Sequence, residues 1–198
     1  EPDTSAVTDE ELTRLAASPL YRGGRHTGVR SRRELAELLR LYDAEIRYTD
    51  HLVGQMCAYL KKRGWYDDCA VILSADHGEQ YGEGQMILEH GTVHDSCIHI
   101  PMLLKLPGGA HRGEVCAHPV YGLDIAPAAA RFFGVAAPEM WHGTALQDTL
   151  DGTAAPREYL VCEHGLYTCQ RAVLQDGWKM VHTFSPGLWD FAEYALYH

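Results

Sequence analysis

The longest periodic run of apolar residues predicts an amphipathic helix over residues 31–63. Its apolar positions are mostly three or four residues apart, which places them along one helical stripe: Leu35, Leu38, Leu39, Tyr42, Ile46, Val53, Met56 and Leu60. Ser31 and Glu34 have capping-box spacing at the start, and Gly64 suits the end. At 1.5 Å per residue this helix would measure about 50 Å, long enough to cross a whole domain.

Shorter apolar runs after this helix predict strands. Residues 70–74 form an unbroken apolar run, which is typical of a strand covered on both faces, and 102–106 form a second one. Asp124 is placed to cap a helix that ends at Phe133. Three further candidate strands are 159–162, 170–174 and 179–183.

The order of these elements predicts how the chain is organised. Residues 1–30 are expected to be a peripheral segment, 31–150 an α/β unit, and 151–198 a small strand-rich subdomain. No internal repeat is visible, and no linker-like composition divides the chain.

The composition is that of an acidic globular protein. Of the 198 residues, 46% are hydrophobic, and the formal net charge of -10 argues against nucleic acid as a partner. No apolar stretch approaches the roughly 18 residues of a membrane span, so no membrane partner is expected. The six cysteines contain no C-x-x-C and follow no zinc spacing. Cys57 and Cys69 lie among apolar residues, which favours free thiols and a reducing, cytoplasmic compartment. No signal peptide is visible, but the true N-terminus is expected to lie upstream, so the localisation stays open.

Asp76 and His77 are the sharpest candidates for chemistry. They follow directly on the apolar run 70–74, and open α/β sheets bind ligands at the carboxyl ends of their strands. Gly78 permits a break in the strand that lets the two side chains converge. An Asp oxygen beside a His nitrogen suits a divalent cation such as Ca²⁺, Mg²⁺ or Mn²⁺. The alternative is a turn capped by Asp76 with His77 packed against it, and two ligands alone do not complete a metal site.

Several motifs, in the right order, resemble the sulfatase family of the alkaline phosphatase superfamily. They are Leu73-Ser74-Ala75-Asp76-His77-Gly78-Glu79, Glu89-His90-Gly91, 100–108, Asp124-Ile125-Ala126-Pro127, Gly143-Thr144-Ala145-Leu146 and Gly177-Trp178-Lys179. The match covers about residues 40 to 185 and resembles the C-terminal half of that family. It implies a partial alkaline phosphatase-like α/β fold, with a mixed, largely parallel sheet flanked by helices.

The resemblance also implies roles for individual residues. Asp76 and His77 would be two ligands of one divalent metal ion, Ca²⁺ or Mn²⁺/Mg²⁺. His90 matches a histidine or lysine that contacts the transferred sulfate or phosphate, or protonates the leaving oxygen. An imidazolium can do either near neutral pH. The alternative for His90 is a loop histidine without a catalytic role.

Three neighbouring side chains receive weaker assignments. His94 stands where the family often has an aromatic residue, so a structural role is expected. Glu79 and Glu83 could orient the metal ligands without binding the ion themselves, or they could be solvated loop carboxylates.

The family's nucleophile is missing from the chain. Sulfatases make formylglycine within a C/S-x-P/A-x-R motif, but Cys57 is followed by Ala-Tyr-Leu-Lys and Cys169 by Gln-Arg-Ala-Val. The family's first acidic pair of metal ligands is missing as well. We therefore expect a fragment of a metal-dependent hydrolase of small sulfate esters, inactive alone, whose formylglycine lies in an absent N-terminal half.

Other functions remain open on the same residues. A phosphodiester or phosphonate monoester hydrolase, or a phosphotransferase, of the same superfamily would act on phosphate esters. A non-catalytic scaffold domain is the alternative from another class. Because half a domain would expose apolar surface, the chain is expected to self-associate or to pair with another polypeptide.

Overall fold

The computed structural model describes residues 2–5, 7–17, 29–83, 87–166, 168–187 and 191–198 of the chain. The elements, in chain order, are α1 (Asp9–Ala17), α2 (Arg32–Lys62), β1 (Val71–Ser74), β2 (Gln80–Tyr81), β3 (Ile87–Glu89), α3 (Asp95–Ile98), β4 (Met102–Lys105), α4 (Ile125–Phe132), α5 (Leu146–Leu150), β5 (Leu160–His164), β6 (Cys169–Gln175), β7 (Trp178–Ser185) and β8 (Tyr194–Tyr197). All six cysteines are free. Within the described ranges, no helix combines the length and the apolar character needed to cross a membrane.

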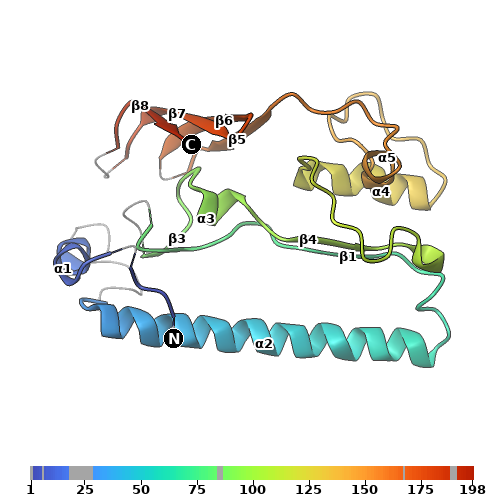
Figure 1. The fold of residues 1–198 in the computed structure, drawn as a ribbon, viewed down its shortest axis with the longest axis horizontal. Coiled ribbons are helices and arrows are strands. Elements are labelled where there is room, and N and C mark those ends of the chain that lie inside the picture. The colour runs from blue at the N-terminus through green and yellow to red at the C-terminus, as the bar shows by residue number, and fades with distance from the viewer. Residues whose placement is uncertain (1, 6, 18–28, 84–86, 167, 188–190) are drawn as a thin grey trace.

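Helix α2 forms one side of the molecule (Figure 1), and its ends match the local sequence signals. The Ser31 side chain accepts a hydrogen bond from the Glu34 backbone N–H and so caps the first turn. Beyond the last turn, Gly64 has a φ of 70°, the left-handed conformation that ends many helices. A small core at the N-terminal end of α2 contains Val7, Leu12, Leu15, Leu35 and Tyr81.

A two-stranded ribbon of β1 and β4 runs alongside α2 (Figure 1). The two strands are antiparallel, with Val71 opposite Lys105 and Ser74 opposite Met102. The expectation of a largely parallel sheet is not met in the described part of the chain, where every paired strand is antiparallel. Apolar content indicates that a strand is covered, but it does not encode the direction of the neighbouring strand.

The end of the chain folds into a four-stranded antiparallel sheet in the order β5-β6-β7-β8. A tight turn at Asp176-Gly177, with φ values of 50° and 79°, joins β6 to β7, as in a type I′ hairpin. Strand β8 was not anticipated from the sequence. Ala172 and Val181 of this sheet form a core with Val93, which lies between β3 and α3. The C-terminal sheet therefore supports the segment that follows β3.

Asp124 precedes α4, but its side chain does not cap that helix as expected. The carboxylate is completely buried and forms an ion pair with Arg157, with one oxygen 2.8 Å from Nη1. It also accepts hydrogen bonds from the backbone N–H groups of Tyr121 and Thr144. A buried carboxylate requires such partners, and the nearby guanidinium is a stronger partner than a helix N–H.

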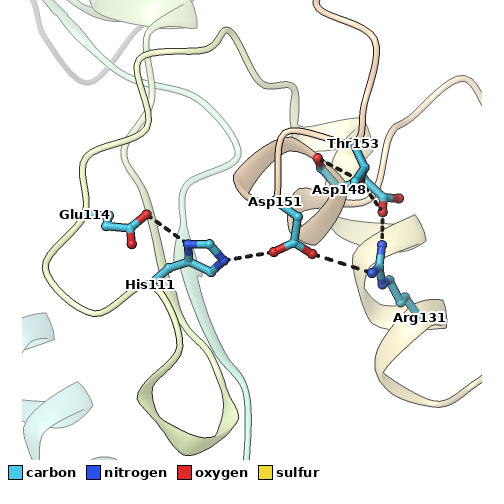
Figure 2. Close-up of polar contacts among 6 residues, drawn as sticks. All are labelled: His111, Glu114, Arg131, Asp148, Asp151 and Thr153. Atoms are coloured by element: carbon cyan, nitrogen blue, oxygen red, sulfur yellow. Dashed lines mark hydrogen bonds and ion pairs between the residues drawn. The ribbon is translucent and has the colours of Figure 1, made fainter.

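A polar cluster joins the loop after β4 to the helices α4 and α5 (Figure 2). The His111 ring lies with Nδ1 2.9 Å from a Glu114 oxygen and Nε2 2.9 Å from an Asp151 oxygen. Arg131 of α4 pairs with Asp148 and lies 3.7 Å from the second Asp151 oxygen. Two basic side chains thus bridge three carboxylates at this end of the molecule.

Candidate functional site

Asp76 and His77 follow β1 in a turn that is packed closely against α3. The Gly78 backbone N–H donates to the Cys97 carbonyl at 2.8 Å. A Cβ atom at Gly78 would come within 1.9 Å of the Ser96 carbonyl oxygen, so no larger residue fits at this position. The chain therefore breaks away from β1 at the place that the sequence predicted, and contact with α3 fixes the turn.

The hydrogen bonds of His77 determine which of its ring nitrogens is available. Nδ1 lies 2.7 Å from the Gly78 carbonyl oxygen, and because a carbonyl only accepts, Nδ1 carries the proton. In the neutral ring, Nε2 then has a free lone pair, and it lies 3.7 Å from Asp76 Oδ2. The other Asp76 oxygen accepts from the His77 backbone N–H at 3.0 Å.

The carboxylate of Asp76 is in its charged form at neutral pH. Its side chain is 89% exposed. The hydrogen bond from the His77 backbone N–H, reinforced by the nearby His77 ring, lowers the pKa of Asp76 below its ordinary value. The exposed Asp76 carboxylate and the neighbouring His77 Nε2 lone pair are groups that can bind a cation.

His90 lies directly against His77. The two rings are stacked, with centroids 3.7 Å apart and planes inclined by 18°. The Nδ1 atom of His90 lies 3.6 Å from Oε1 of Glu79. The structure thus brings together all three residues that the sequence singled out, although His90 stands 13 positions after His77 in the numbering.

The donor set fits a divalent cation in part. With metal–ligand distances of about 2.0 to 2.6 Å, neighbouring ligand atoms on one ion stand roughly 3 to 3.7 Å apart. The distance between His77 Nε2 and Asp76 Oδ2 lies at the upper end of that range. Among the residues with described positions, no group of three or more His, Cys, Asp or Glu side chains is arranged to hold a metal. The pair therefore offers two ligands and needs others.

The two loop glutamates, which the sequence could not separate, have different surroundings. Glu83 accepts a hydrogen bond from the Tyr81 backbone N–H at 2.6 Å, and so closes a local turn. Glu79 faces His90 instead. Glu79 precedes β2 and Glu83 follows it, and so the two carboxylates have different partners. The sequence carries no signal for this difference.

Two further histidines are near the site. His94 accepts a hydrogen bond from the Ser96 backbone N–H at the start of α3, and burial, together with the Lys179 charge, lowers its pKa. These contacts support the structural role that the sequence predicts for His94. His164, at the end of β5, is close enough to His90 that the charge of His90 adds to the effect of burial in lowering the pKa of His164. No pattern in the sequence connects these two residues.

Comparison with protein families and curated proteins supports the resemblance. The family model described as "Sulfatase" matches residues 3–135. The multifunctional alkaline phosphatase superfamily protein PehA of Trinickia caryophylli is 28% identical over 114 residues, 57% of this chain and 22% of that protein. The choline-sulfatase of Rhizobium meliloti is 26% identical over 148 residues, 72% of this chain and 28% of that protein. The chain spans less than a third of the length of these two relatives.

Solved structures show the same fold. The phosphonate monoester hydrolase SpPMH from Silicibacter pomeroyi aligns with a TM-score of 0.73 and 22% identity, over 89% of this chain and 38% of that one. The phosphonate monoester hydrolase of Agrobacterium radiobacter gives 0.73 and 21%, over 96% and 43%. The expected alkaline phosphatase-like class of mixed helices and strands is thereby confirmed. The family model covers well over half of the chain, which therefore belongs to the sulfatase family.

Proposed function

We propose that the chain is part of a metal-dependent hydrolase that cleaves small sulfate esters. The observation that carries the proposal is the meeting of Asp76, His77 and His90 at the end of β1, with two donor atoms 3.7 Å apart and a third ring stacked beside them. The nucleophile, a formylglycine in the family, and the remaining metal ligands would come from outside these residues.

Each of the three side chains has a distinct task in this proposal. Asp76 Oδ2 and His77 Nε2 would hold the ion, with the Gly78 carbonyl keeping the His77 ring in the correct tautomer. A bound divalent ion supplies Lewis-acid stabilisation of the charge on the ester oxygens. His90, in its imidazolium form, would donate a proton to the departing alcohol oxygen, which needs one when the alcohol is a poor leaving group, and would be left as the neutral ring.

Substitution of the site residues in the full-length protein tests the proposal. We expect His90→Ala to lower kcat on an alkyl sulfate by about 100-fold or more, as is usual for loss of a general acid. Asp76→Asn should weaken Mn²⁺ binding, measured by calorimetry. His51→Ala is the matched control, since this histidine is exposed on α2 and contacts Gln55. Full activity of both site variants would refute the assignment.

A phosphonate monoester or phosphodiester hydrolase is the second candidate. It is favoured by the fold likeness to two phosphonate monoester hydrolases, each with a TM-score of 0.73. A sulfate and a phenylphosphonate that share the 4-nitrophenyl leaving group would separate the two activities. A higher kcat/KM on the sulfate supports the first proposal, and a higher value on the phosphonate supports the second.

A further inference from the structure

Glu79 faces His90, and this contact has no part in the proposed function above. Glu79 Oε1 and His90 Nδ1 are 3.6 Å apart, and each atom is buried without a hydrogen-bond partner among the described residues. A buried carboxylate oxygen and a buried ring nitrogen normally find partners, because leaving either one unpaired costs free energy. These two atoms face each other, so a small shift that shortens the distance between them would let them form one hydrogen bond that satisfies both.

The backbone on both sides of this pair is fixed. Gln80, next to Glu79, is fully buried, and its Oε1 accepts a hydrogen bond from the Thr92 hydroxyl at 3.0 Å. Gly91, next to His90, accepts at its carbonyl oxygen from the Thr168 hydroxyl at 2.7 Å. The two segments that carry Glu79 and His90 are therefore tied to each other and to the C-terminal sheet.

The surroundings of His90 restrict how its ring can turn. The His77 ring covers one face at 3.7 Å between centroids. A half-turn about the Cβ–Cγ bond would keep the stack but would exchange Nδ1 with Cδ2 and Nε2 with Cε1. Glu79 favours the orientation with Nδ1 toward its carboxylate. In this orientation Nε2, whose bonding direction diverges from that of Nδ1, points away from the Glu79 carboxylate.

We propose that Glu79 is a positioning residue for His90, which holds Nδ1 toward the protein and leaves Nε2 to face the ester. The second half of this statement rests on the proposed function, whereas the first concerns the ring alone. Glu79 acts through His90 and does not itself touch the substrate.

The first test observes the ring directly. In the chain labelled with ¹⁵N-histidine, long-range ¹H–¹⁵N spectra report the tautomer of each ring, and His90→Gln identifies the signals of His90. At a pH where the ring is neutral, we expect wild-type His90 to show one tautomer with the hydrogen on Nδ1, and Glu79→Ala to show a mixture. Glu83→Ala is the matched control, because this carboxylate of the same loop bonds to Tyr81 and should leave the His90 signals unchanged. Identical His90 signals in wild type and Glu79→Ala would overturn the positioning role.

The second test measures turnover in the full-length protein. Glu79→Ala should lower kcat on an alkyl sulfate by roughly 10- to 100-fold with little change in KM, as is usual when an orienting partner is lost. The loss should shrink on 4-nitrophenyl sulfate, whose leaving group needs no proton. Glu79→Gln keeps an acceptor oxygen for Nδ1–H and should recover most of the rate. Should Glu79→Ala fail to fold by circular dichroism, Glu79→Gln with its ring spectrum carries the test.

The outcomes separate the two proposals. A changed ring signal with a rate loss that depends on the leaving group supports both. A changed ring signal with an unchanged rate keeps the positioning role and refutes His90 as the acid. Loss of Mn²⁺ affinity in Glu79→Ala, equal to that in Asp76→Ala, would overturn the positioning role in favour of Glu79 as a ligand.

Discussion

At the scale of single residues, the close contact between Gly78 and α3 determines the shape of the candidate site. The turn after β1 approaches the Ser96 carbonyl so closely that only a hydrogen atom fits between them. The same turn directs Asp76 and His77 toward one another and fixes the tautomer of His77 through the Gly78 carbonyl. Gly78, which has no side chain, thus determines where the polar side chains of Asp76 and His77 lie.

Substituting this glycine should therefore destabilise the fold. Gly78→Ala would force the 76–79 turn away from α3, since the new Cβ would lie 1.9 Å from the Ser96 oxygen. We expect a loss of about 1–3 kcal/mol in the free energy of unfolding, measured by urea denaturation. Gly54→Ala is the matched control, because this glycine of α2 has open space around it. In a helix interior that change should stabilise by about 0.5–1 kcal/mol. Equal effects of the two variants would contradict the packing argument.

At the scale of elements, the structure is held together by contacts between segments that are distant in the sequence. The C-terminal sheet contacts the segment after β3 through Val93, whose backbone N–H donates to the Gln170 side chain at 3.2 Å. Lys179 of β7 forms an ion pair with Asp95 of α3 at 2.7 Å. The His111 cluster joins the loop after β4 to α5 in the same way (Figure 2).

The His111 cluster should make stability depend on pH. Both ring nitrogens face carboxylates, so hydrogen bonds from the ring to Glu114 first, and then to Asp151, raise the pKa of His111 in the folded chain. The folded state therefore binds this proton more tightly than the unfolded state, whose pKa is about 6.5. The contribution is complete below that value and is lost as the pH rises through the folded pKa.

Denaturant midpoints of the wild type and His111→Asn across pH 6 to 9 would measure this effect. Asn tolerates the left-handed backbone of His111, whose φ is 55°, and so removes the imidazole without new strain. The stability difference between the two proteins should be largest at the lowest pH and shrink as the pH rises. A constant difference would show that the ring contributes no charge-dependent stability.

Local signals in the sequence were sufficient for some elements and not for others. The residues that mark the ends of α2 stand close to those ends in the sequence: Ser31 and Glu34 at the start, and Gly64 after the last turn. The sequence therefore predicts this helix almost to the residue. The sequence predicts a helix cap at Asp124, because its partner in the structure, Arg157, stands 33 positions away and leaves no local signal. The Glu79–His90 pair depends in the same way on how two loops meet. Polar contacts between distant segments carry no local pattern, and this is why they were missed.

At the scale of the whole molecule, α2 exposes an apolar face that lies beside the stripe predicted from the sequence and shares Met56 with it. Its exposed members are Leu41, Tyr48, Leu52, Met56 and Tyr59, with Leu41 and Met56 each 66% exposed. They are three, four or seven positions apart, so they lie along one face of the helix. An apolar face of this extent marks a contact surface or a site of aggregation.

The isolated chain is therefore expected to self-associate through α2. Light scattering across a concentration series should show a mass above 22.1 kDa that falls toward that of the monomer when Met56 and Leu52 are replaced by Glu. Val115→Glu is the matched control, since this residue is 94% exposed in a loop outside α2. A wild-type chain that stays monomeric and resists proteolysis would argue against an interaction surface on α2.

The link between Val93 and Gln170 spans 77 positions, and it has a consequence for the order of folding. The loop that carries His90 cannot be secured until β6 and β7 have left the ribosome, because its anchors come from that sheet. Closing so long a loop is slow compared with forming α2, whose bonds are local. Helix α2 should thus form early in synthesis, and the loop around His90 should become fixed only after β6 and β7 have been made.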